Sequence, residues 1–143
     1  MKGHLNGIAD IRAVIENERM LCGAVECKKI RLRSGEEFAN PVITYVDACG
    51  GTLYSLSFVS DQGERLIAHV NDIGLIVEPV HKRVCELKNQ HAKTEKLHER
   101  LVYLKRLCEL NEGFCTAPFL QEVKALVDDT GWRLQKRMFL CLS

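Results

Sequence analysis

Apolar residues first recur every three or four positions along this chain and then at every second position. Residues 6–20 have the helical spacing, and we expect a short amphipathic helix there. From Ala24 the period is two, which is typical of a half-buried strand, and Ser34-Gly35 indicates a hairpin turn. Asn40-Pro41 predicts a bend, a bulge or a sheet edge in the next strand, because proline cannot donate to the hydrogen-bond ladder.

Short apolar segments continue to residue 77, separated by tight turns that contain Gly, Asn or Asp. We expect strands at residues 42–47, 53–59, 64–70 and 73–77. Together with the strand that begins at Ala24 they make five, and connections as short as these favour antiparallel neighbours. The pattern therefore predicts one small five-stranded antiparallel barrel, whose interior leaves little room for a substrate. Function is then expected on the barrel surface, its loops or the added helices.

The remainder of the chain has the composition of helices. Residues 80–111 contain no Gly or Pro and are rich in Lys, Glu, Leu and Arg, which predicts one long helix. Its middle part, residues 88–96, is polar on almost every face and is expected to project into solvent or to contact a partner. Thr116 is the expected N-cap of a second helix, and residues 132–142 are expected to form a short terminal strand.

The predicted fold is α+β and has two parts of different charge. Residues 1–78, the helix and barrel, contain 8 basic and 11 acidic residues, whereas residues 79–143, the helical tail, contain 12 basic and 8 acidic residues. The tail is expected to pack on the barrel or on a partner subunit. The overall net charge is only +1, so composition alone does not indicate a strongly charged partner.

The seven cysteines favour a reducing compartment. Their number is odd and they include no Cys-x-x-Cys pair, so we expect most of them to be small buried thiols in a cytoplasmic protein. No apolar run is long enough to span a bilayer, and we expect no membrane association.

Short motifs accompany this order of elements. They are Ile11-Arg12-Ala13-Val14-Ile15 in the leading helix, Pro41 in the second strand, Tyr54-Ser55-Leu56 in the third, and Arg65 through Asp72-Ile73 at the end. Over residues 8–78 they resemble the WYL domain, an Sm-like barrel of the SH3 type found in bacterial regulators. Leu53 stands where that family usually has Trp, and Asp72 stands about where it has Arg. The resemblance implies a regulatory module of a bacterium or phage that binds nucleic acid or a small nucleotide-like ligand, with Tyr54 and Arg65 among the binding residues.

The basic residues Lys29, Arg31 and Arg33 of the first strand form one candidate binding surface. They share one face at a spacing that can follow phosphates, and aromatic residues of later strands could stack on bases nearby. The same charges also fit a solvated strand face that keeps an edge from pairing. The aromatic candidates are Tyr45, Tyr54 and Phe58. The candidate residues for binding nucleic acid or another ligand are Lys29, Arg31, Arg33, Tyr54, Arg65 and His69.

The predicted long helix is the second candidate surface. Residues 81–106 contain eight Lys or Arg and three acids, and such a helix could lie on phosphate, on an acidic protein or simply in solvent. His91, Thr94 and His98 recur at near-heptad spacing, which also permits a homodimeric coiled coil. The candidate interaction residues are Lys88, His91, Lys93, Lys96, His98 and Arg100.

Few residues offer chemistry. Cys49 lies in a glycine turn with His69 on a neighbouring strand, which fits a cysteine nucleophile or simply a hairpin turn. Two pairs of residues have the helical spacing of zinc ligands, but no further pair completes a site. They are His81 with Cys85, and His91 with His98. We therefore expect no catalytic activity, no cofactor and no metal.

The function expected from these observations is that of a non-catalytic regulatory module. It would bind nucleic acid, a nucleotide-like ligand or a regulatory protein partner, as a homodimer. One alternative is a structural or interaction protein that acts through a dimerising or docking helical tail. The other is a small cysteine-dependent enzyme.

Overall fold

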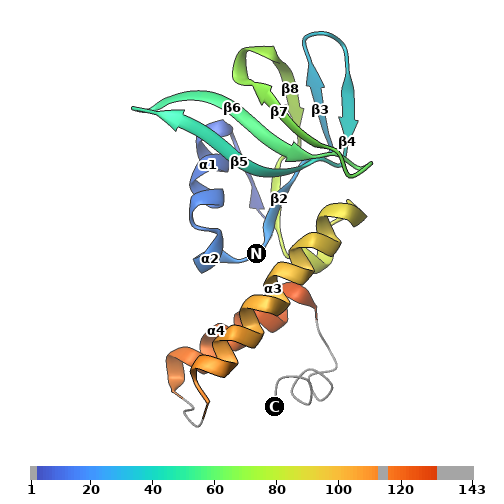
Figure 1. Ribbon diagram of the computed structural model, residues 1–143. Coiled ribbons are helices and arrows are strands. Elements are labelled where there is room, and N and C mark those ends of the chain that lie inside the picture. Colours follow the sequence, from blue (N-terminus) through green and yellow to red (C-terminus); the bar gives the residue numbers. More distant parts are fainter. Residues whose placement is uncertain (1–2, 113–115, 132–143) are drawn as a thin grey trace.

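The computed structural model describes residues 3–112 and 116–131 and shows an α+β fold (Figure 1). In these residues the strands form two antiparallel sheets. The first sheet has six strands in the order β1 (Gly3–His4), β9 (Val80–Lys82), β2 (Ala24–Glu26), β5 (Val42–Cys49), β6 (Thr52–Val59) and β7 (Arg65–His69). The second has three strands in the order β4 (Glu37–Ala39), β3 (Lys29–Leu32) and β8 (Ile73–Val77).

The first two predicted strands are each bent into two, so that each contributes to both sheets. β2 and β3 are separated at Cys27-Lys28, and β4 and β5 are separated at Asn40-Pro41. Asn40 has a left-handed backbone with φ 47°, and the bend expected at Pro41 is confirmed. The turn expected at Ser34-Gly35 is confirmed as well, because it joins β3 and β4 into an antiparallel hairpin.

The prediction of one closed five-stranded barrel is wrong. β7 and β8 are outer strands of different sheets, and no strand pairing joins them in the part of the chain that the structure describes. Between them the 3₁₀ turn η1 (Val70–Asp72) redirects the chain, so that β8 pairs with β3 instead of β7. The two bent sheets are therefore open along β8, and one edge of this strand pairs with no other strand among the described residues.

One apolar core fills the space between the sheets and the leading helices. α1 (Ile8–Glu16) lies against β5 and buries Ile11, and the single turn α2 (Glu18–Leu21) follows it (Figure 1). The helix predicted for residues 6–20 is thus interrupted at Asn17, and Gly7 occupies the N-cap position. The buried residues that meet Ile11 in this core include Val25, Ile30, Ile43, Leu56 and Phe58.

The helix predicted for residues 80–111 is shorter than expected. β9 (Val80–Lys82) joins the first sheet beside β2, and the 3₁₀ turn η2 (Val84–Glu86) follows it. Pairing with a strand that is distant in the sequence overrides the helical preference of this segment. α3 (Gln90–Leu110) begins only after Asn89, whose side chain accepts a hydrogen bond from the N–H of Ala92.

The second tail helix, α4 (Ala117–Thr130), is capped by Thr116 as predicted. It packs along α3, and Leu104, Val123 and Leu126 are buried between the two helices. None of the helices in the described residues is long and apolar enough to cross a membrane. The terminal strand predicted for residues 132–142 lies outside the described residues.

Opposite charges of the two parts of the chain meet between the tail and the sheets. Glu18 of α2 accepts hydrogen bonds from Lys96 and Arg100 of α3, at 2.8 and 2.9 Å. Arg65 of β7 pairs with Glu95 of α3 at 2.6 Å. The tail therefore contacts the first part of its own chain, and Lys96, expected to face solvent or a partner, is used in that contact.

Candidate functional site

The predicted basic stripe on β3 is largely neutralised by an acid of the next strand. Glu37 lies opposite Arg31 in the β3–β4 hairpin and accepts hydrogen bonds from that guanidinium at 2.7 and 2.8 Å. Lys29 lies 3.5 Å from the same carboxylate. The hydrogen bond from Arg31 is the main cause that holds the pKa of Glu37 below its usual value. These two cations are therefore engaged within the hairpin, and Arg33 remains exposed beyond the end of β3.

The other predicted ligand-binding residues lie elsewhere. Tyr54 is exposed on β6, and Arg65 and His69 are exposed on β7. The structure does not bring them together with Lys29 and Arg31, because β3 belongs to the other sheet. Tyr45 and Tyr54 are exposed, but the stacking role considered for Phe58 is wrong because that ring is buried against the ring of Phe38.

The residues predicted to form an interaction helix divide into two groups. Lys96 and Arg100 have side chains only 12% and 14% exposed, and both pair with Glu18. Arg100 also donates to Asp129 of α4 and to the carbonyl of Gly23, so it links three parts of the chain. The remaining members lie on the first turns of α3 or just before it, and most of them are exposed. They are Lys88, His91, Lys93 and His98.

The geometry does not assemble the considered cysteine nucleophile with its base. Strand register places His69 opposite Ser55, and Ser55 pairs with Asp47 of β5. Cys49 pairs with Thr52 at the far end of the same hairpin, beyond the last residue of β7. His69 is therefore not aligned with Cys49, and its Nδ1 accepts a hydrogen bond from the N–H of Asn71.

The considered zinc pair His81 and Cys85 also lacks the expected arrangement, whereas His91 and His98 both lie on α3 at the predicted helical spacing. His81 belongs to β9 and Cys85 to η2, so the two residues do not share a helix. The buried ring of His81 lies with Nε2 2.7 Å from the carbonyl oxygen of Cys22. Among the described residues no three or more His, Cys, Asp or Glu side chains are grouped so that they could hold a metal ion.

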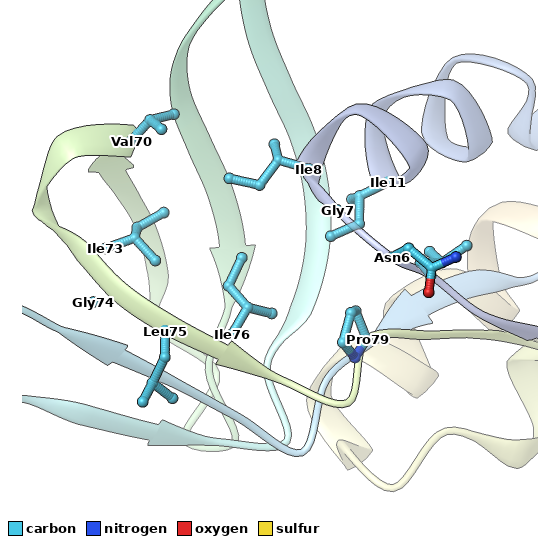
Figure 2. A pocket seen from close by; sticks show the side chains of 11 residues that line it. Asn6, Gly7, Ile8, Ile11, Val70, Ile73, Gly74, Leu75, Ile76 and Pro79 are labelled. Atoms are coloured by element: carbon cyan, nitrogen blue, oxygen red, sulfur yellow. The ribbon is translucent and has the colours of Figure 1, made fainter.

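An apolar groove of about 320 Å³ lies between β8 and the loop that leads into α1 (Figure 2). The side chains of Ile8, Ile73 and Ile76 point into it, whereas Leu75 points away (Figure 2). The rest of the lining consists of Leu5, Asn6, Gly7, Ile11, Val70, Gly74, Leu75 and Pro79. No lining residue is charged, so the groove favours an uncharged occupant.

The unpaired edge of β8 runs along this groove. On its other side β8 pairs with β3, where Ile76 faces Ile30 and Leu75 faces Arg31. Edge strands are usually protected from further pairing by Lys, by Pro or by a charge that points inward. β8 has the sequence Ile-Gly-Leu-Ile-Val and contains none of these. A free strand edge and an apolar groove therefore lie side by side (Figure 2).

The sequence pattern predicts the bounds of β8 but not its position at the edge of a sheet. The run Ile73–Val77 has the predicted boundaries, but it is not the last strand of a five-stranded barrel. The available signal was the absence of any charge in the run, which is unusual for a strand at an edge. Whether the strand lies at an edge depends on the pairing of β7, and the local sequence does not specify that pairing.

Comparisons of the chain with protein-family models, with curated proteins and with solved structures found no match. The resemblance to the WYL domain therefore stays a prediction.

Proposed function

We propose that the protein is a non-catalytic binding module that holds an extended peptide segment of a partner protein along the free edge of β8. The observation that carries this proposal is the coincidence of an unprotected strand edge with an uncharged groove. A bound segment would form main-chain hydrogen bonds with β8, and its alternate side chains would enter the groove. Main-chain pairing would supply affinity and the groove would supply selectivity.

The lining of the groove defines the chemistry of the segment. A charged side chain would lose its hydration without gaining a partner there, because no lining residue carries a charge. We therefore expect apolar side chains at every second position of the segment. Proline is excluded at positions that face β8, because proline has no N–H to donate to the ladder.

The ion pairs within the two predicted basic surfaces make these surfaces less suited to nucleic acid than to a protein partner. Lys29 and Arg31 are engaged by Glu37, and Lys96 and Arg100 are engaged by Glu18. A surface that binds phosphates has to offer cations that are free to contact them. The coiled coil expected from His91, Thr94 and His98 stays a prediction, whereas the apolar residues farther along α3 pack against α4. Of the expected functions, binding of a protein partner through a peptide segment is therefore the one that the geometry supports best.

A peptide-display selection tests the proposal and does not require the partner to be identified first. Short random peptides are selected against the purified protein, and we expect enrichment of uncharged sequences with apolar residues at every second position. Selected peptides are then titrated against two variants, Ile73→Lys on β8 and Ile67→Lys on β7. We expect Ile73→Lys to weaken binding at least about tenfold, because it places a charge at the groove. Ile67 is 77% exposed on the other outer strand, so its variant should bind normally.

A second measurement separates loss of the site from loss of the fold. Ile73 is partly buried against the core, so thermal unfolding is measured for both variants. Independently, proline is introduced at successive central positions of a selected peptide, which leaves the protein unchanged. The proposal predicts loss of binding at alternate positions. Selection of charged or helical peptides, or equal binding to Ile73→Lys and the unmodified protein, would contradict it.

A further inference from the structure

Three lysines from separate elements meet at a second cleft, which is polar and has a volume of about 280 Å³. Lys28 lies at the bend between β2 and β3, Lys82 lies on β9, and Lys88 lies just before α3. The other lining residues are Glu26, Cys27, Asn40, Glu78 and Val80. Lys28 and Lys82 were not among the residues selected from the sequence, which pointed to the opposite face of the first strand.

A buried carboxylate organises this cleft. The side chain of Glu26 is only 1% exposed and forms an ion pair with Lys82. It also accepts hydrogen bonds from the backbone N–H groups of Lys88 and Asn89, at 3.0 and 2.8 Å. The N–H groups before α3 are thus already engaged, and a ligand would have to be bound by the lysine side chains. Glu26 therefore holds Lys82 and the backbone of Lys88 in place at the cleft.

Positive charge remains in excess in the cleft. Lys28 and Lys88 are exposed, and in the part of the chain that the structure describes neither side chain has an ion-pair partner within 4.0 Å. Glu26 neutralises Lys82, and the remaining acid is Glu78, which is exposed at the rim. The lining therefore includes two exposed lysines without an ion-pair partner among the described residues, and one exposed carboxylate. A dianion would balance the cations better than this carboxylate does.

The backbone of the rim is strained. Asn40 and Glu78 both have a left-handed backbone with φ 47°, although neither is glycine. Such a conformation is unfavourable for most residues other than glycine and is often found where a ligand is held. Asn40 is fixed by its N–H, which donates to the carbonyl of Lys28, and by its carbonyl, which accepts from Asn89. Hydrogen bonds thus connect Asn40 at the rim to Lys28 and to Asn89, the residue after Lys88.

We infer that this cleft binds a phosphate group, with Lys28 and Lys88 as the principal contacts and Lys82 as a supporting cation. Its volume lies just below the range of roughly 300–1,000 Å³ that is typical of pockets for larger ligands. The cleft thus suits inorganic phosphate or the phosphate end of a small monoester. Cys27 takes no part as a nucleophile, because burial raises the pKa of its thiol to about 12. The inference is independent of peptide binding at β8.

Titration with inorganic phosphate and with phenyl phosphate tests the inference. Binding is followed by calorimetry and by amide chemical shifts, at low and high chloride concentration. We expect Lys28→Ala and Lys88→Ala each to weaken binding about tenfold, because each removes a charge-assisted contact. Glu78→Gln should strengthen binding several-fold, since it removes the rim carboxylate. Lys105→Ala is the matched control, an exposed lysine of α3 outside the cleft, and should leave the affinity unchanged.

The outcomes separate the two sources of the phosphate group. Tighter binding of inorganic phosphate supports a free-phosphate site, and tighter binding of phenyl phosphate supports a monoester site. Because Lys28, Lys88 and Lys105 are all exposed, the variants are expected to fold, and thermal unfolding verifies this. Binding of neither compound, or equal weakening by Lys105→Ala, overturns the inference. No gain in affinity from Glu78→Gln also contradicts it.

Discussion

Replacement of Glu26 by Gln is expected to weaken the attachment of the tail to the sheets. The carboxylate of Glu26 is almost fully buried, accepts the N–H groups of Lys88 and Asn89, and pairs with Lys82. Gln has a similar size, but it replaces one acceptor oxygen by an amide nitrogen and removes the charge. The side chain of Lys82 is only 14% exposed, and its ammonium group is then left without its partner.

The magnitude follows from the burial of this pair. Removal of one member of a buried ion pair typically costs about 3–5 kcal/mol, because the other charge stays buried and uncompensated. Lys82 keeps some access to water, so we expect the lower end, about 3 kcal/mol of unfolding free energy. That is a large share of the roughly 5–15 kcal/mol by which most domains are stable. The melting temperature should fall by roughly 10 °C.

Urea unfolding followed by circular dichroism measures this loss. Glu37→Gln is the matched control, because Glu37 also pairs with two cations but is exposed, and its loss should be much smaller than that of Glu26→Gln. The double variant Glu26→Gln with Lys82→Met should recover about 1–2 kcal/mol, since it no longer buries an unpaired charge. The reasoning is refuted if Glu26→Gln costs no more than Glu37→Gln. It is also refuted if Lys82→Met adds to the loss.

Three further predictions concern single groups. In an NMR titration the pKa of Glu37 should lie below its usual value and should rise in Arg31→Gln, whereas an unchanged pKa in that variant would contradict the assignment. Because folding lowers this pKa, the stabilisation is present above the unfolded-state pKa and is lost as the pH falls through the folded-state pKa. Alkylation followed by mass mapping should modify exposed Cys49 before Cys27, whose pKa burial raises to about 12, and the reverse order would disprove the burial argument. Asn89→Ala should cost about 3 kcal/mol in urea unfolding, and Asn89→Ser about 1 kcal/mol less because its hydroxyl can retain the cap; equal losses would argue against the capping role.

Local signals in the sequence predicted the elements whose causes are local. Proline at Pro41 bends its strand because it cannot donate to a ladder, and Thr116 caps α4 with its hydroxyl. The segment Val80–Lys82 was predicted as helix and is a strand, because it pairs with β2, a partner distant in the sequence. The prediction of a closed barrel was wrong for a similar reason. A closed barrel requires β7 to pair with β8, and the sequence of neither strand shows that they lie in different sheets.

The candidate sites were harder to predict than the elements. The spacing of Lys29 and Arg31 correctly places them near each other, but their neutralisation depends on Glu37 across the hairpin. Lys28 was missed because the bend at Cys27-Lys28 turns it toward residues of β9 and the start of α3. The groove beside β8 combines residues from the N-terminal loop, α1 and the end of the sheet. Such a surface exists only after the chain has folded.

The most direct test of strand addition at β8 is a scan of backbone N-methylation in one peptide from the display selection. Each N–H is methylated in turn, and the affinity of every analogue for the unmodified protein is measured by calorimetry. Strand addition predicts that methylation at alternate positions abolishes binding, because only every second N–H of the peptide faces β8, whereas the intervening positions tolerate the methyl group. Equal tolerance at all positions, or equal loss at all of them, would contradict the account.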